Sequence, residues 1–171
     1  MASNQPTKAI QVIPSDSINI PEPGSYISGT NAGTGIILTD AGATFLDGQT
    51  NAGGTGYFNR VAAGDVVYEP STKTAAKVVS VDGNTKLTLS APGLTGGVSY
   101  NIYRGVGGSN TKSGNEGFSL FVGTGGDIKV LPASSTNPVI LKNVSNNSYV
   151  PLQVIRVFNT DTTASDILAL D

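Results

Sequence analysis

The chain of 171 residues contains no cysteine, no histidine and no tryptophan. Without cysteine there are no disulfides, so extra stability must come from burial or from association with copies and partners. Without histidine and cysteine, serine–histidine and cysteine–histidine nucleophile systems are excluded, and so are zinc sites with the usual ligands. Carboxylate pairs remain conceivable, but nearly all acidic residues lie in expected turns or at strand starts, where an aspartate side chain caps its own backbone. We therefore expect no catalytic residues, no cofactor site, no metal site and no enzymatic activity.

Charge is also scarce, at 13% of residues with a formal net charge of −2. The lysines lie singly among acidic residues, so no basic stripe can neutralise phosphates, and we expect no nucleic-acid partner. No apolar run approaches the ~20 residues of a membrane helix, so we expect no membrane association. The polar residues 1–8 are followed by no apolar run, which predicts the absence of a signal peptide.

Turn-forming residues are abundant by contrast. The 22 glycines and 9 prolines, together with Ser, Thr and Asn, separate short runs of β-branched residues, and no window keeps a helical period. This pattern predicts an all-β fold. The most regular part, residues 64–103, has the size of a small SH3-like or OB-like barrel. Within it we expect a hairpin turn at residues 82–84, because Asp-Gly accepts the positive φ of tight β-turns.

Three other segments are distinctive. Residues 1–24 predict an extended, proline-punctuated arm, and a rigid terminus or an arm across a neighbouring subunit fits equally well. Residues 105–117 are a flexible linker by composition, and strand patterns resume after them. Gln153 and Arg156 interrupt the alternation of the apolar run 150–158, which indicates a bulge, a subunit interface or an ordinary solvent-facing position.

Residues 9–17 (AIQVIPSDS), 120–128 (LFVGTGGDI) and 149–170 together resemble a family of short phage structural proteins. The family includes spike-base proteins of gene transfer agents and capsid-associated proteins of marine and cyanobacterial phages. In that family the opening leads directly to the second stretch, whereas here about a hundred residues intervene. The closing segment departs from the pattern at Asp161, where the family usually has glycine. Residues 63–90 look like a module found inside other phage structural proteins.

This resemblance implies two small β-barrel or sandwich domains, with the second inserted into a loop of the first. Residues 1–28 and 115–171 would form a base barrel, and residues 29–114 the inserted barrel. The implied function is a capsid decoration (cement) protein on the virion exterior, made in the bacterial host cytoplasm. Its implied partners are the major capsid protein and copies of itself, as a homo-oligomer and specifically a trimer. The alternatives are a vertex spike base, a tail or neck component, or a carbohydrate-binding adsorption module.

Two sets of candidate residues follow from these hypotheses. The arm and the last long strand supply the suspected capsid or subunit interface, which comprises Ile10, Val12, Pro14, Pro21, Pro23 and Arg156. A carbohydrate-binding module would need exposed aromatic side chains. The candidates for that outward surface are Tyr57, Phe58, Tyr100 and Tyr103, although packing in the core explains them at least as well.

Overall fold

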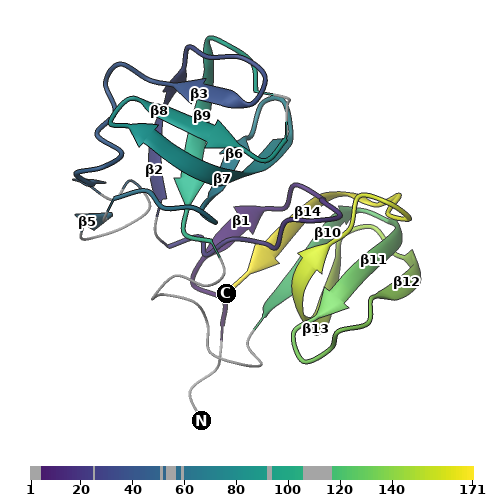
Figure 1. The fold of residues 1–171 in the computed structure, drawn as a ribbon. Coiled ribbons are helices and arrows are strands. Elements are labelled where there is room, and N and C mark those ends of the chain that lie inside the picture. Colours follow the sequence, from purple (N-terminus) through teal and green to yellow (C-terminus); the bar gives the residue numbers. More distant parts are fainter. Residues whose placement is uncertain are drawn as a thin grey trace. The chain divides into compact units, whose positions relative to one another are not determined.

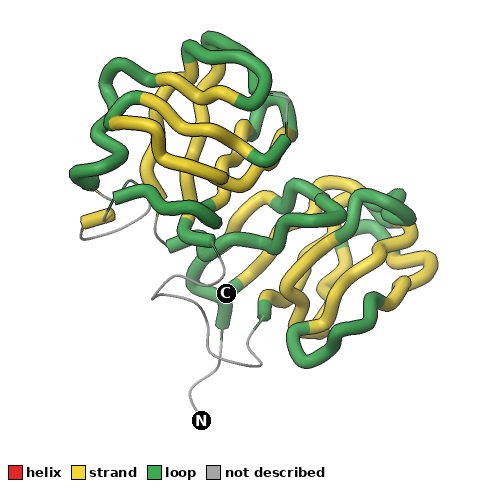
Figure 2. Tube along the Cα trace, in the orientation of Figure 1, coloured by secondary structure: helices red, strands yellow, loops and turns green. Residues whose placement is uncertain are grey.

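The computed structural model describes residues 5–24, 26–50, 52, 57–58, 60–91, 94–105 and 117–171. These residues form strands and loops and no helix, so the predicted all-β fold is confirmed, with two sheets of six strands (Figures 1 and 2). In this described part, accordingly, no helix is suited to crossing a membrane. The chain divides into two compact units, one of Met1–Ile20 with Lys112–Asp171 and one of Pro21–Thr111. The sequence placed these boundaries after residues 28 and 114, and the interpretation of the second unit as an insertion stays a prediction.

The first unit contains one antiparallel sheet of six strands, in the order β1-β14-β10-β13-β11-β12 (Figure 1). Its strands are β1 (Ala9–Gln11), β10 (Phe118–Thr124), β11 (Gly126–Pro132), β12 (Val139–Val144), β13 (Ser148–Val157) and β14 (Ser165–Leu170). Alternate residues of β11 and β14 are buried, as the two-residue period of a strand predicts. The fully buried side chains are Leu120, Val122, Ile128, Val130, Val154 and Ala169.

The arm belongs to this sheet. β1 pairs with β14, and the chain then continues past it, with the Val12 N–H donating to Ile167 O at 2.9 Å and the Ile20 N–H donating to Ile155 O at 2.8 Å. Its apolar side chains, including Ile13 and Ile18, are buried. The arm is therefore a strand-like part of the unit, whose apolar residues contribute to its buried core.

The run 150–158 is irregular in the way that its sequence indicated. Opposite Leu131 and Pro132, β13 presents Arg156 and Val154, so one extra residue lies in β13 between two partners. This is a β-bulge, which bends the strand and changes the direction of the following side chains. Of the three interpretations of Arg156, the bulge is therefore confirmed.

The second unit contains another antiparallel sheet of six strands, in the order β2-β9-β6-β7-β8-β3. Its strands are β2 (Tyr26–Asn31), β3 (Ile37–Thr39), β6 (Val66–Glu69), β7 (Thr74–Gly83), β8 (Lys86–Leu89) and β9 (Val98–Tyr103). A small separate pair is formed by β4 (Gln49–Thr50) and β5 (Tyr57–Phe58). The sheet curls so that its two end strands, β2 and β3, approach each other. The Ala32 N–H, just after β2, donates to Thr39 O of β3 at 2.7 Å.

The predicted hairpin in this sheet is present, but its turn is displaced. β7 runs through Gly83, and Asn84 and Thr85 make the turn into β8, with Gly83 paired to Lys86. Asp82 is the extra residue of a bulge between Val81 and Gly83, and its carboxylate accepts hydrogen bonds of 2.7 Å from the hydroxyls of Ser80 and Thr88. The prediction that Asp82-Gly83-Asn84 forms the turn is therefore wrong by about a residue.

A partly buried hydrogen bond joins the core of the second unit to one of its loops. Tyr100 is 1% exposed and packs near Phe45, and its hydroxyl donates to Asp40 Oδ2 at 2.8 Å. Asp40 is itself fixed, since Oδ2 accepts the Thr30 N–H and Oδ1 accepts the Gly42 N–H. Gly29 lies against both polar atoms, so a Cβ there would collide with Asp40 Oδ2 and the Tyr100 hydroxyl.

We predict that Gly29→Ala destabilises the second unit by about 1–3 kcal/mol, because neither colliding side chain is free to move aside. Gly83→Ala is the matched control, since nothing lies within 4 Å of a Cβ at this glycine, which is also in a strand. Urea unfolding of both variants measures the difference. Equal stabilities for the two variants would contradict the prediction.

Candidate functional site

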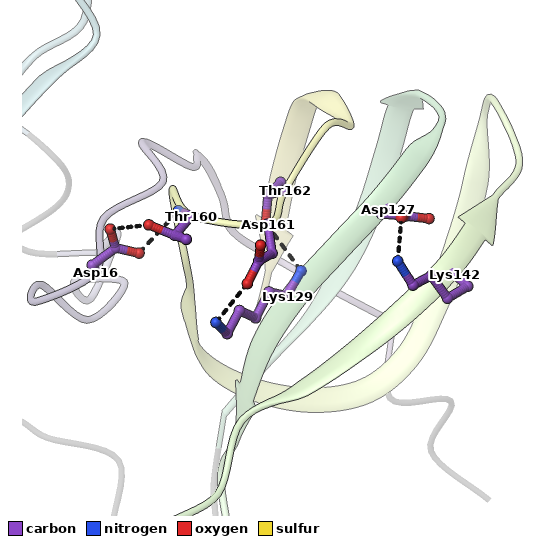
Figure 3. Close-up of polar contacts among 7 residues, drawn as sticks. All are labelled: Asp16, Asp127, Lys129, Lys142, Thr160, Asp161 and Thr162. Carbon is purple, nitrogen blue, oxygen red and sulfur yellow. Dashed lines mark hydrogen bonds and ion pairs between the residues drawn. The ribbon is translucent and has the colours of Figure 1, made fainter.

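The densest group of polar contacts in the first unit lies where the arm, β11, β12 and the β13–β14 loop meet. Figure 3 shows seven residues of this group, which we call the polar clasp: Asp16, Asp127, Lys129, Lys142, Thr160, Asp161 and Thr162. Asp16 comes from the arm, residues 160–162 from the loop after β13, Asp127 and Lys129 from β11, and Lys142 from β12.

Threonine side chains and backbone fix the β13–β14 loop to β11. The Lys129 N–H donates to Thr162 Oγ1 at 3.0 Å, and the Asp127 N–H donates to Thr163 Oγ1 at 2.9 Å. In return the Thr163 N–H donates to Asp127 O at 2.8 Å. The loop thus offers β11 the bonds that a neighbouring strand would supply, which satisfies backbone groups that have no regular partner there.

The arm is fastened to the same loop and to β13. The Asp16 carboxylate accepts the Thr160 N–H at 3.0 Å and the Thr160 hydroxyl at 2.7 Å. Arg156 donates from Nε to Asn19 Oδ1 at 2.8 Å and from a terminal nitrogen to Asp16 O at 3.1 Å. Its guanidinium also lies 5.5 Å from the centre of the Phe158 ring, within the range of a cation–π contact.

Two ion pairs complete the clasp. Lys129 Nζ lies 2.8 Å from Asp161 Oδ2, and Lys142 Nζ lies 2.6 Å from Asp127 Oδ2. The other oxygen of Asp127 accepts the Asn143 N–H at 3.0 Å. Asn143 has φ of 52°, a left-handed conformation that asparagine tolerates better than most residues, and it forms part of a bulge at the end of β12.

These contacts stabilise the ionised carboxylates. Hydrogen bonds from the N–H and hydroxyl of Thr160 lower the pKa of Asp16, and Lys142 with the Asn143 N–H lowers the pKa of Asp127. Each carboxylate of the clasp is already engaged by a cation or by N–H and O–H donors. Among the described residues no cluster of three or more acidic groups could hold a metal ion. These contacts hold the arm to the β13–β14 loop and hold that loop against β11.

The suspected interface residues lie partly inside the molecule. Ile10, Val12, Pro21 and Pro23 are buried, and Pro14 is half-buried. The side chains of Ile10 and Val12 contribute to the core, and the exposed residues of the arm are 5–9, 11, 16 and 17. Arg156, half-buried, holds the arm to β13 within one chain, an intramolecular role that its sequence context did not indicate.

The proposed aromatic surface needs a correction. Tyr100 and Tyr103 are 1% and 6% exposed, so they do not form an outward ligand surface. Tyr103 packs against the rings of Tyr26 and Tyr68, with centroids 5.0 and 5.5 Å away, and burial raises its pKa to about 12. The alternative that these aromatics pack inside the protein is therefore confirmed for both. The side chains of Tyr57 and Phe58 fall outside the described residues.

Sequence reasoning missed a different exposed group, on β12. Val139 and Ile140 are each 41% exposed, although both occur in a run with the apolar character of a strand. The sequence signal for a strand was present, but nothing in it marked the strand as the end of the sheet.

Comparisons with known protein families, curated proteins and solved structures found no match to this chain.

We predict that Arg156→Lys loosens the arm, because an ammonium group cannot make the two divergent hydrogen bonds and the ring contact together. The expected loss of stability is about 1 kcal/mol. Hydrogen exchange at residues 12–20 should become faster while exchange in β6–β9 stays unchanged. Arg60→Lys, the same substitution at an exposed residue of the second unit, is the matched control and should change stability little.

The lowered pKa values of Asp16 and Asp127 predict an acid-sensitive clasp. Their stabilising effect is present above the ordinary carboxyl value of 3.8 and is lost as pH falls through their lowered values. Asp16→Asn and Asp127→Asn should therefore be less stable than the natural chain at pH 7, and the difference should shrink below pH 3.8. A difference that is constant with pH in urea titrations would contradict this.

Proposed function

We propose that the chain is a bacteriophage virion structural protein, specifically a decoration protein that binds the outside of the assembled head. Its partners would be the major capsid protein and copies of itself. The mechanism is thermodynamic: many copies that bind only the assembled shell stabilise it by mass action, without any chemical step.

The observation that carries this proposal is the placement of the three stretches that resemble phage structural proteins. The first stretch contains β1, the second covers most of β10 and the start of β11, and the third covers β14 and all but the first residue of β13, although about a hundred residues separate the first stretch from the second. In the sheet these five strands are consecutive, in the order β1-β14-β10-β13-β11. The resemblance therefore follows one structural unit rather than scattered segments.

The departure of the closing segment from the resembling pattern is physically compatible with that pattern. Asp161 stands where the pattern usually has glycine, and its φ is 65°. Glycine adopts this left-handed conformation freely, and aspartate tolerates it better than most residues do. The Asp161 side chain also gains an ion pair with Lys129. Both residue types can thus support the same loop conformation.

Two alternatives remain within the virion, a vertex spike base and a tail or neck component. They differ from a decoration protein in position on the particle and in abundance. The carbohydrate-binding alternative has lost two of its four aromatic candidates, because Tyr100 and Tyr103 are buried. No contact or exposed aromatic cluster among the described residues favours it over a structural role.

We predict that purified particles of the encoding phage contain this chain in numbers comparable to the major capsid protein. Quantitative mass spectrometry gives the ratio, and immunogold labelling of intact particles gives the location. For a decoration protein we expect gold label over the whole head. For a spike base the label would lie at the vertices and the protein would be much less abundant. Labelling confined to the tail, or absence from the particle, would overturn the proposal.

A further inference from the structure

β12 forms one end of the six-stranded sheet of the first unit and pairs only with β11 among the described strands (Figure 1). Such an end strand presents unpaired N–H and C=O groups, which proteins usually protect with charges, prolines or bulges. β12 has such protection at its margins, with Pro138 before it and Lys142 and a bulge near its end, but it exposes Val139 and Ile140 between them. Its free backbone edge and its apolar side chains occur at the same place.

Only part of this edge is regular enough for pairing. Near its end, β12 presents two residues, Lys142 and Asn143, where β11 presents one, and Asn143 has φ of 52°. This bulge protects the end of the strand. The regular stretch is therefore residues 139–141, where Leu141, Ile140 and Val139 pair in turn with Ile128, Lys129 and Val130 of β11.

The charge on this edge favours an uncharged occupant. Lys142 is the one charged residue of β12, and its ammonium is already paired with Asp127 of the same chain at 2.6 Å. A second copy of β12 can therefore approach without repulsion between unpaired lysines. Antiparallel pairing about residue 140 would place Ile140 opposite its own copy and Val139 opposite Leu141, so every side-chain pair in the regular stretch is apolar.

We propose that β12 is a self-association strand, which pairs antiparallel with β12 of a second copy across a two-fold axis at Ile140. This inference deepens the proposed function, because it names a surface through which copies on the shell contact one another. A contact through one short strand buries little surface, so the pairing is weak in solution. On a shell, neighbouring copies are held at high effective concentration and the same contact is populated.

Sedimentation velocity of the purified chain over a concentration series tests this. We expect a monomer–dimer equilibrium that Ile140→Lys abolishes, because two lysines would then face each other at the axis. Val79→Lys is the matched control: Val79 is 55% exposed and lies on β7, between two other strands of the second unit. It should leave the equilibrium unchanged. A strictly monomeric natural chain, or a dimer that survives Ile140→Lys, overturns the proposal.

The absence of cysteine allows a second test that detects even a weak contact. Ile140→Cys introduces a single thiol, which lies opposite its copy in the proposed register and should form a disulfide-linked dimer under mild oxidation. Val79→Cys should remain monomeric on the same non-reducing gel. A trimer in sedimentation, or equal crosslinking of both variants, overturns the two-fold pairing. Both tests use the purified chain and the proposed function is tested on particles. A negative result for self-association therefore does not decide whether the chain is a decoration protein.

Discussion

The first unit depends on the pairing of β1 with β14, which joins the two ends of the chain. Ile10 pairs with Ala169, and the arm beyond β1 is then fixed by Asp16, Asn19 and Arg156. Closing a loop this long costs only modestly more entropy than closing a short one, because the cost rises with the logarithm of length. The long sequence separation affects the rate of folding more strongly than the stability of the folded unit, since contacts distant in sequence form late. We therefore expect the contiguous second unit to form before the arm docks.

With no disulfides and few charges, both units use hydroxyl, amide and carboxylate side chains to fix their loops. In the second unit, fully buried Asn31 accepts the N–H groups of Gly33 and Thr39, and fully buried Glu69 accepts the N–H of Thr95 and the hydroxyl of Thr72. In the first unit, the threonines after β13 do the same for β11. Such bonds matter mainly because a buried donor or acceptor left unpaired is costly. The abundance of Thr, Asn and Asp thus reflects loops that need local partners.

The sequence predicted the strands and turns from the two-residue period and the turn residues. It did not predict which residues pack against each face of a strand. The β-branched runs predicted strands, and the broken alternation at Gln153 and Arg156 indicated a bulge as one of three interpretations, of which the structure shows the bulge. The same alternation could not show that Tyr103 is buried beside Tyr26 and Tyr68, because a period assigns residues to a face without identifying its neighbours. Nor could it pair Arg156 with Asn19, which is distant in sequence. The exposure of β12 follows from the order of strands in the sheet, which no local pattern encodes.

The lysines of the clasp are paired within the chain, and this has a consequence for any partner that binds at the edge of β12. The clasp neutralises Lys129 with Asp161 and Lys142 with Asp127, and the regular part of β12 is apolar. Attraction between exposed charges would weaken at the salt concentrations of a cell or its surroundings, whereas backbone pairing and apolar burial are little affected. A protein that stabilises a particle in variable surroundings benefits from contacts of the second kind. The low charge of the chain and a structural role on a particle exterior are therefore consistent on physical grounds.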